Sequence, residues 1–414
     1  MKANPFTSET FVSKWLEHFN NAEPGRSFPS IQGLGFTKHR FLPLFTNIGK
    51  THTKGINYTV GNPDVKDLKG KVLLIYDVPT YFEMNPKFKS DALKLVKVKQ
   101  YPGFLINLVP FGDLDEYMAS SFKRSSRYKL KKYRKKLESC FDIRYKMFYG
   151  EMSKEEYDLI FKAFNHLLNK RFEDKQVTNN NLAKQEWDFY YELVYPLLLK
   201  KKAGLFVIYN GNQPIGVTLN YFSEDILFDA ITVFDIDYAK FRLGSVTIMK
   251  LIEWSIEQNI KIFDFSKGYF DYKKRWASKE YDFEYQIIYD STSIYASSIA
   301  LFFKKYFELK QILRDKKVNE KLHSLTYRLK KKSKTPIDKA VCEYLESEDF
   351  PNESLVQIDL DTIQSYSLKT AINDFLYINN ESQLNLKIFK VTHEAGQYLL
   401  HGKEKKTRVK MTFK

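Results

Sequence analysis

The feature that most constrains the fold is an ordered series of strand and helix signals between Gly204 and Phe265. Two apolar runs are joined by Asn210-Gly211, a pair that tolerates the positive φ angles of a tight hairpin turn. A third apolar run covers 226–234, and an amphipathic stretch over 245–258 separates it from a short strand over 260–265. The order strand, strand, strand, helix, strand predicts a mixed α/β unit.

Similar signals continue upstream of this unit. Apolar runs over 71–78 and 104–111 predict two strands. Ser153 and Glu156 form a capping box, in which the hydroxyl and the carboxylate satisfy free N–H groups at a helix start. Apolar residues at three- and four-residue spacing follow, so we expect a helix here and a second one over 182–202.

Downstream of the unit, 281–289 predicts one more strand and 293–333 a long helical segment. Residues 336–414 predict a small module that ends in a frayed basic tail. We find no internal repeat in the sequence. We therefore expect an N-terminal α/β half at 1–115, a central domain at 116–292, a helical segment with a basic end at 293–335, and an appended α/β module at 336–414.

The composition excludes several classes of protein. Hydrophobic residues make up 43% of the chain and aromatic residues 16%, too many for a disordered chain. The first residues lack the apolar stretch of a signal peptide, and the longest apolar runs fall well short of the roughly 20 residues of a membrane-spanning helix. Cys140 and Cys342 lie far apart and have no metal-binding spacing. We expect a folded cytoplasmic protein without a metal.

Positive charge is concentrated in three segments, although the net charge is +16. Lys123–Lys136 holds nine basic residues and no acidic ones, and Arg328–Lys334 and Lys403–Lys414 are also strongly basic. The rest of the chain is nearly neutral. Such segments are compatible with solvated faces and also with anionic lipid headgroups, while Tyr128 and Tyr133 in the first segment can stack on RNA bases.

The linker over 235–245 is the stretch that most invites a ligand. It connects a strand to a helix, and Gly244 lies where that helix opens. A helix start presents free N–H groups and the positive end of the helix dipole, and both favour a phosphate group. Most helix starts bind only water, so this signal is weak by itself.

Several motifs in this region follow one another in an order that is fairly specific. They are a basic helix at Arg124–Leu137, Lys170-Arg171-Phe172, a turn at Gly211–Gly216, the helix start Leu243-Gly244-Ser245, and a final block of Asp264, Gly268, Tyr272, Lys273, Arg275 and Trp276. Together they resemble the acyltransferases of the GNAT superfamily. The resemblance is to the FemABX-like branch, which includes cellulose-biosynthesis-type (CelD-like) acetyltransferases, and it covers about 100–290 well.

The resemblance implies an α+β, mixed α/β GNAT-like fold, built from two GNAT-like halves with 116–292 as the catalytic domain. Two central strands would splay and admit the pantetheine arm of acetyl-CoA, which would serve as co-substrate, and no metal is implied. The cofactor-binding residues would be Leu243, Gly244, Ser245 and Val246, with the backbone amides of the last three holding the pyrophosphate.

Direct acyl transfer needs a base for the acceptor and an acid for the departing thiolate. We assign Asp235 as the base or acceptor-orienting group and Tyr272 as the acid, with Lys273 neutralising phosphate or an anionic acceptor. Bland alternatives stand beside these roles, since Asp264 fits a structural hydrogen-bond partner and Trp276 fits core packing. The expected substrate-binding residues are Arg127, Arg171, Asp264, Arg275 and Trp276.

Three functions remain open. The first is an acyl-CoA-dependent N- or O-acyltransferase, acting on a saccharide or a cell-envelope or polysaccharide precursor. The second is a FemABX-like aminoacyl-tRNA-dependent transferase, in which the basic helix meets tRNA. The third is a non-catalytic membrane-surface protein that uses the 293–333 helix as an amphipathic foot. A cytoplasmic location is expected, and the basic segments would suit peripheral contact with the anionic inner face of a membrane.

Overall fold

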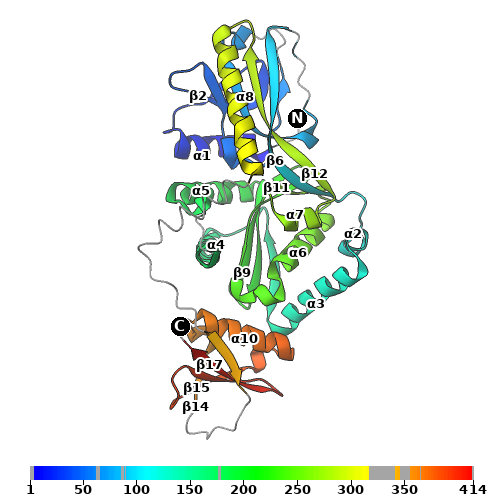
Figure 1. Cartoon of the computed structure of the whole chain (residues 1–414), viewed down its shortest axis with the longest axis vertical. Coiled ribbons are helices and arrows are strands. Elements are labelled where there is room, and N and C mark those ends of the chain that lie inside the picture. The colour runs from blue at the N-terminus through cyan, green and yellow to red at the C-terminus, as the bar shows by residue number, and fades with distance from the viewer. Residues whose placement is uncertain are drawn as a thin grey trace.

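The computed structural model describes residues 4–61, 66–84, 88, 90–175, 179–316, 341–345, 355–363 and 365–412. Figure 1 shows an elongated molecule with the N-terminal strands at one end and the C-terminal module at the other. The central part, which runs from α2 to α7, lies between them. The expected α+β, GNAT-like fold class is confirmed.

Within the described residues, twelve strands form one mixed sheet in the order β1-β2-β3-β5-β12-β6-β11-β10-β9-β8-β7, with β4 paired to β2. Their bounds are β1 Arg26–Phe28, β2 Ile31–Lys38, β3 Leu44–Asn47, β4 Thr59–Val60, β5 Val72–Pro79, β6 Leu93–Asn107, β7 Ile143–Phe148, β8 Ala203–Asn210, β9 Gln213–Ser223, β10 Ile226–Phe234, β11 Ile262–Lys267 and β12 Lys279–Asp290. The long strand β6 pairs with both β11 and β12, so it joins the two ends of the sheet.

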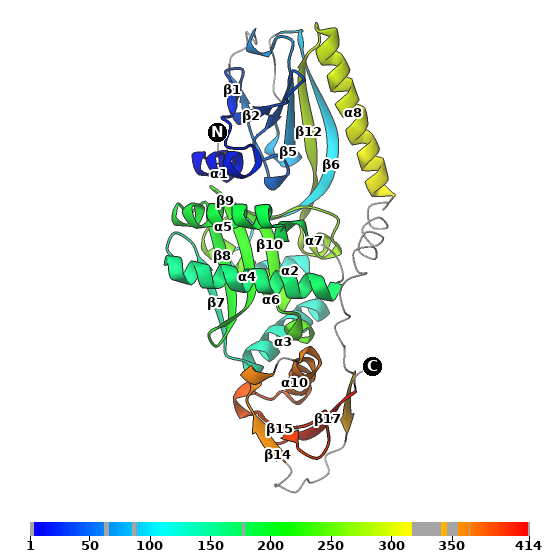
Figure 2. The ribbon, with the colours of Figure 1, turned by 90° about the vertical axis from the view of Figure 1, so that its left-hand side faces the viewer.

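Helices cover both faces of the sheet. Their bounds are α1 Glu9–Phe19, α2 Leu114–Ser121, α3 Arg124–Cys140, α4 Lys154–Lys175, α5 Lys184–Leu199, α6 Leu243–Glu257, α7 Asp271–Trp276 and α8 Ile294–Asp315. Helices α4 and α5 pack with α1 against one face of the strands β8 to β10, through one continuous apolar core. Helices α2, α3 and α6 pack on the other face, and α8 covers β5, β6 and β12 (Figure 2).

One strand arrangement occurs twice in the sheet. In each half, three antiparallel strands end on a strand that pairs in parallel with the next one: β3 with β5, and β10 with β11. A long antiparallel strand then follows, β12 beside β5 and β6 beside β11. The halves are thus related by topology although the sequence shows no repeat. The proposed domain boundaries themselves stay a prediction.

The C-terminal module is a separate five-stranded antiparallel sheet with one helix. Its elements are β13 Val341–Leu345, β14 Leu355–Ile358, α10 Tyr366–Asn379, β15 Lys387–Val391, β16 Gln397–His401 and β17 Lys406–Thr412. The expectation of a frayed basic tail is wrong for 406–412, because β17 pairs with β13 on one side and β16 on the other. The basic run Arg328–Lys334 lies outside the described residues.

Most predicted elements are confirmed, and their bounds changed by a few residues. The Asn-Gly turn joins β8 to β9, with Gly211 at φ +57°. Ser153 accepts a hydrogen bond from the Glu156 N–H at 3.1 Å, as the capping box predicts. Pro196 lies inside α5. Among the described residues, no helix is long and apolar enough to span a bilayer.

Candidate functional site

The two parallel strands β10 and β11 separate soon after they meet. They pair over only three positions, from Ile226 opposite Ile262 to Phe228 opposite Asp264. Beyond this point β10 continues to Phe234 and β11 to Lys267 without pairing to each other. The opening between them is framed by an irregular register on each outer side, after Asp229 in β10 and after Asp264 in β11.

Helix α6 begins beside this opening. Within the described residues, the N–H groups of Leu243 and Gly244 have no hydrogen-bond acceptor, whereas those of Ser245 and Val246 donate to the Arg242 carbonyl at 2.8 and 3.2 Å. A Cβ atom at Gly244 would lie 2.6 Å from the ring of Phe234, so only glycine fits this close approach of helix and strand. Two free amides at a helix start form an anion-binding surface.

Asp264 lies at the bottom of the opening and is fully buried. Its carboxyl group accepts hydrogen bonds from the hydroxyls of Tyr81 at 2.8 Å and Tyr281 at 2.7 Å, and from the Ser266 N–H at 2.7 Å. Burial raises its pKa to about 6, although these hydrogen bonds and the charge of Lys273 oppose the shift. Asp264 is therefore held in place by its partners, as the structural interpretation of this residue predicts.

Lys273 and Asp229 supply two more buried titratable groups. Lys273 donates to the Lys267 carbonyl at 2.9 Å. Burial lowers its pKa to about 8, while the charges of Asp229 and Asp264 act in the opposite direction. Asp229 accepts a hydrogen bond from Thr232 on its own strand at 2.7 Å, and burial raises its pKa. A lysine and a carboxyl group with shifted pKa values thus lie close together beside the opening.

The N-terminal half contributes a second charged group that the sequence analysis missed. Asp77 is fully buried and contacts the Lys267 ammonium at 2.5 Å, Gln100 at 2.8 Å and Thr53 at 2.9 Å. Lys54 is near enough to feel these charges, and burial, followed by the charges of Lys267 and Lys273, lowers its pKa to about 8. These residues are far apart in the sequence, and only the exchange of β6 and β12 between the halves brings them together.

Unsatisfied polar atoms lie on the same part of the sheet. The Thr218 hydroxyl and the Asn220 side-chain oxygen on β9 are buried and have no hydrogen-bond partner among the described residues. Thr218 lies opposite Thr232, and Asn220 lies opposite Asp229. The Ser266 hydroxyl on β11 is also buried without a partner. Buried polar atoms are rarely left unpaired, so these three indicate a place for a polar ligand or water.

Asp235, the predicted base, is engaged in other contacts. Its carboxylate accepts a hydrogen bond from the Asp237 N–H at 3.0 Å and contacts the Lys170 ammonium at 2.5 Å, while Asp237 contacts Lys170 at 2.6 Å. Burial opposes the charged form of Lys170, but the two carboxylates raise its pKa. Asp235 therefore caps a short helix and joins it to α4. Its catalytic role stays a prediction.

Arg171 and Tyr272 reach the outer end of the opening. Arg171 donates to the Thr232 carbonyl at 3.2 Å and lies over the ring of Phe234. Burial raises the pKa of Tyr272, and the nearby charge of Asp229 adds to the shift while Arg171 opposes it. These two predicted residues are thus brought to the same place as Lys273.

The other predicted substrate residues lie elsewhere. Trp276 is 1% exposed and packs against Phe122, which agrees with core packing. Arg275 is exposed on α7. Arg127 lines a separate open hollow of about 540 Å³ between α2 and α3.

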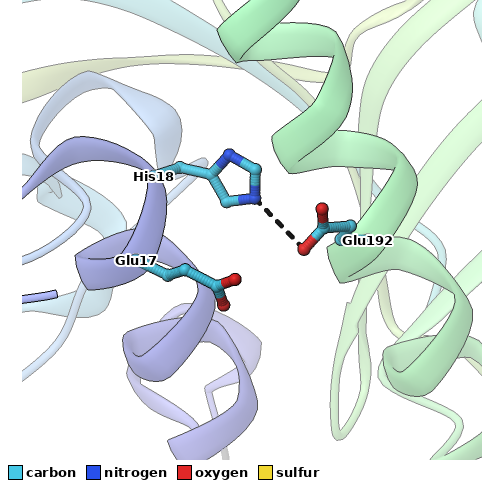
Figure 3. A group of neighbouring side chains, drawn as sticks. All are labelled: Glu17, His18 and Glu192. Atoms are coloured by element: carbon cyan, nitrogen blue, oxygen red, sulfur yellow. Dashed lines mark ion pairs between the residues drawn. The ribbon is translucent and has the colours of Figure 1, made fainter. Parts of the chain in front are cut away.

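One group of possible metal ligands occurs in the described part of the chain, but a lysine already occupies its centre. His18 on α1 faces Glu192 on α5 at 3.3 Å, with Glu17 beside them (Figure 3). The Lys14 ammonium contacts Glu17 at 2.9 Å and Glu192 at 2.8 Å. Because Lys14 neutralises both carboxylates, the group joins two helices and offers a metal little net negative charge.

Comparison with known proteins agrees with the geometry of the opening. Residues 124–274 match the model of the family described as Acetyltransferase (GNAT) domain. This range includes α3, α6, β10 and β11, and it extends to the first turn of α7. A search of curated proteins finds no match.

Solved structures similar to this chain are all distant. A conserved protein of unknown function from Bacteroides thetaiotaomicron VPI-5482 is 8% identical, with a TM-score of 0.47 over 70% of this chain and 92% of that one. FemX is 12% identical, with a TM-score of 0.46 over 68% and 92%. L-PGS from Bacillus licheniformis is 12% identical, with a TM-score of 0.40 over 75% and 98%. The family match over 124–274 supports a GNAT acetyltransferase domain and, in general, a transferase.

Proposed function

We propose that this protein is an acyl-CoA-dependent N- or O-acyltransferase of the GNAT type. It transfers an acyl group directly to an amine or hydroxyl of a saccharide or of a cell-envelope or polysaccharide precursor, as CelD-like acetyltransferases suggest. The observation that carries the proposal is the short parallel pairing of β10 and β11 beside the free amides of Leu243 and Gly244. This arrangement suits a thioester between the strands and a pyrophosphate at the helix start.

The chemistry follows from the buried groups beside the opening. In the proposed reaction the acceptor atom attacks the thioester carbon, its proton passes to the Asp229 carboxylate, and the C–S bond breaks. Lys273, whose pKa is about 8, then protonates the departing sulfur, because a thiol has a pKa of about 8.5. Tyr272 is a weaker acid than Lys273, so we assign it to hydrogen bonding rather than to full proton transfer.

Other residues position the reacting groups in this proposal. Asp235 and Lys170 hold the linker before α6, while Arg171 and Arg275 meet negative charge on the donor or the acceptor. Ser245 and Val246 lie in the first turn of α6 and border the pyrophosphate, although their N–H groups already have an acceptor. No metal takes part in the proposed reaction.

The second candidate is aminoacyl transfer from tRNA, and helix α3 is the observation that favours it. Most basic residues of α3 are exposed, and Tyr128 is 69% exposed among them. This surface suits a phosphate backbone with stacked bases. Contact of the same basic surface with anionic lipid at the inner face of a membrane is a related proposal.

Calorimetric titration with acetyl-CoA tests the proposal. Ser245→Asp places a carboxylate in the first turn of α6, where it repels a pyrophosphate but stabilises the helix. We expect affinity to fall at least about tenfold, the result of roughly 1.4 kcal/mol of lost binding free energy. Ser298→Asp, on the exposed start of α8, makes the same chemical change and should leave affinity unaltered.

A parallel titration with deacylated tRNA separates the two candidates. No heat with acetyl-CoA, together with tRNA binding that weakens steeply with salt, would replace the acyl-CoA proposal by aminoacyl transfer.

A further inference from the structure

Helix α8 carries the largest concentration of exposed apolar side chains in the described part of the chain. Its inner face, which includes Ala296, Ile299 and Phe307, is buried against β5, β6 and β12. Its outer face is also apolar, so the helix is not amphipathic in the usual sense of one wet side. The exposed large residues of α8, between 41% and 86% exposed, are Ile294, Tyr295, Leu301, Phe302, Tyr306, Leu309, Ile312 and Leu313.

The spacing of these residues places them on one surface. Tyr295, Phe302, Tyr306, Leu309 and Leu313 recur at intervals of seven, four, three and four, which is one stripe along a helix. Ile294, Leu301 and Ile312 form a second stripe beside it. Single exposed apolar residues need no explanation, but a continuous surface of this size indicates an interaction site.

The charges on this surface are those that suit anionic lipid. Lys305 is the one charged residue in the middle of the outer face, and its long side chain is 68% exposed. Lys304 and Lys310 lie at its two edges, and Lys310 also contacts the ring of Tyr306. The acid nearest to these lysines, Glu308, is shared between Lys304 and Lys305.

A lysine with an apolar stem can lie among lipid headgroups while the neighbouring leucines enter the acyl region. A protein partner would instead have to supply an acid for Lys305 in the middle of an apolar interface. Tyrosines at the border of the surface have the amphipathic character of residues at a membrane interface.

The surface lies next to the outer end of the opening between β10 and β11. The Tyr269 hydroxyl, in the loop after β11, bonds to Gln311 at 2.8 Å and to Asp315 at 3.2 Å on α8. Tyr269 and Phe270 are themselves 52% and 57% exposed. The apolar surface therefore continues from α8 onto the loop that leads into α7.

We infer that the outer face of α8 lies in the interface of an anionic bilayer, with its axis in the plane of the membrane. In this position the loop at 269–270 faces the lipid, so that an acceptor anchored in the membrane can reach the opening from the side. The attachment is distinct from the proposed contact through the basic segments, because apolar side chains drive it. The inference about attachment does not require the proposed acyl transfer.

Vesicle sedimentation tests this inference with two matched double variants of the full chain. Leu301→Glu with Leu309→Glu changes α8, and Leu159→Glu with Leu384→Glu makes the same changes at leucines 68% and 88% exposed elsewhere. The vesicles contain phosphatidylglycerol mixed with phosphatidylcholine. We expect the α8 variant to lose at least about tenfold in partitioning and the control to lose less than about twofold. Wild-type binding should largely persist in about 1 M salt, where charge interactions are screened within about 3 Å.

Two results would overturn the inference. Equal binding by both variants, with loss of all binding in high salt, would mean that the basic segments alone attach the protein. A wild-type dimer without lipid that the α8 variant alone dissolves, measured by analytical ultracentrifugation, would mean that a second copy of the chain covers this face.

Discussion

The two halves of the sheet begin a parallel strand pair in the same way and finish it differently. In the N-terminal half, β3 and β5 pair over three positions and end with Thr46 opposite Leu74. The next residue, Asn47, is buried and accepts a hydrogen bond from the Tyr76 N–H at 2.8 Å, so its side chain bridges the two strands. The pair is closed by this bridge.

In the central half, the corresponding positions leave the strands apart. The last pair is Phe228 with Asp264, and the next residue, Asp229, bonds to Thr232 on its own strand. The Ser266 N–H, which corresponds to that of Tyr76, bonds to Asp264 on its own strand. The same topology therefore gives a closed core in one half and a polar opening in the other, and a few side chains decide which.

The connections after the strands differ as well. Between β3 and β5 the chain forms only short turns and the small strand β4, and its buried residues Ile56 and Tyr58 fill an apolar core. Between β10 and β11 it forms α6, which starts with glycine beside Phe234. A complete helix is needed to direct free amides at a ligand. The comparison teaches that the sheet supplies the gap and the connection supplies the anion site.

The largest expected effect comes from breaking the contact that joins the halves. Asp77→Asn leaves the largely buried Lys267 ammonium without its counter-charge, and asparagine tolerates the φ of +61° at this position. We expect the free energy of unfolding to fall by about 3 kcal/mol or more in urea denaturation. The matched control is Asp282→Asn, whose pair with Lys99 is exposed and should contribute about 1 kcal/mol at most. Similar losses in both variants would show that the halves do not depend on the buried pair.

The next effect concerns catalysis in the open half. Lys273→Ala should lower the rate of thiol release from acetyl-CoA, with glucosamine as a probe acceptor, by about a hundredfold. Lys274→Ala removes the same side chain at the neighbouring exposed position and should leave the rate nearly unchanged. Acetyl-CoA binding by Lys273→Ala serves as the check on folding. A normal rate in this variant would remove Lys273 from the proposed reaction.

The smallest effect is a dependence of stability on pH that only the open half should show. The pKa of Asp264 is raised from 3.8 to about 6, so the folded state favours the protonated acid. Its contribution to stability is complete below the unfolded pKa and is lost as the pH rises through about 6. Relative to Asp264→Asn, the wild type should lose about 1 kcal/mol of unfolding free energy between about pH 5 and pH 7. A constant difference across this range would contradict the assignment. The corresponding residue of the closed half, Leu74, cannot titrate.

Local signals in the sequence predicted much of the open half. The Asn210-Gly211 turn and the apolar run over 226–234 gave β8, β9 and β10, because turn chemistry and continuous burial act over short distances. Strand β6 was recognised only from 104 onward. Its first part alternates lysines with apolar residues, and pairing with β12 stabilises it more than any local preference does.

The site was less predictable, for a related physical reason. The helix start at Gly244 and the position of Lys273 follow from motifs that are contiguous in the sequence. Lys54 and Asp77 come from the other half, and nothing near them in the sequence indicates charge pairing. Asp235 was assigned as a base because it follows a strand end, but residues at that position also cap helices, and the contact with Lys170 cannot be read from spacing.

Hydrogen–deuterium exchange with and without acetyl-CoA is the most direct test of the central claim, because one experiment reports on both halves. We predict slower exchange over 226–234 and over the first turns of α6 when acetyl-CoA is present, and no change over 44–47 and 72–79. Protection of the closed half, or no protection in either half at saturating acetyl-CoA, would contradict the claim that the opening between β10 and β11 is the donor site.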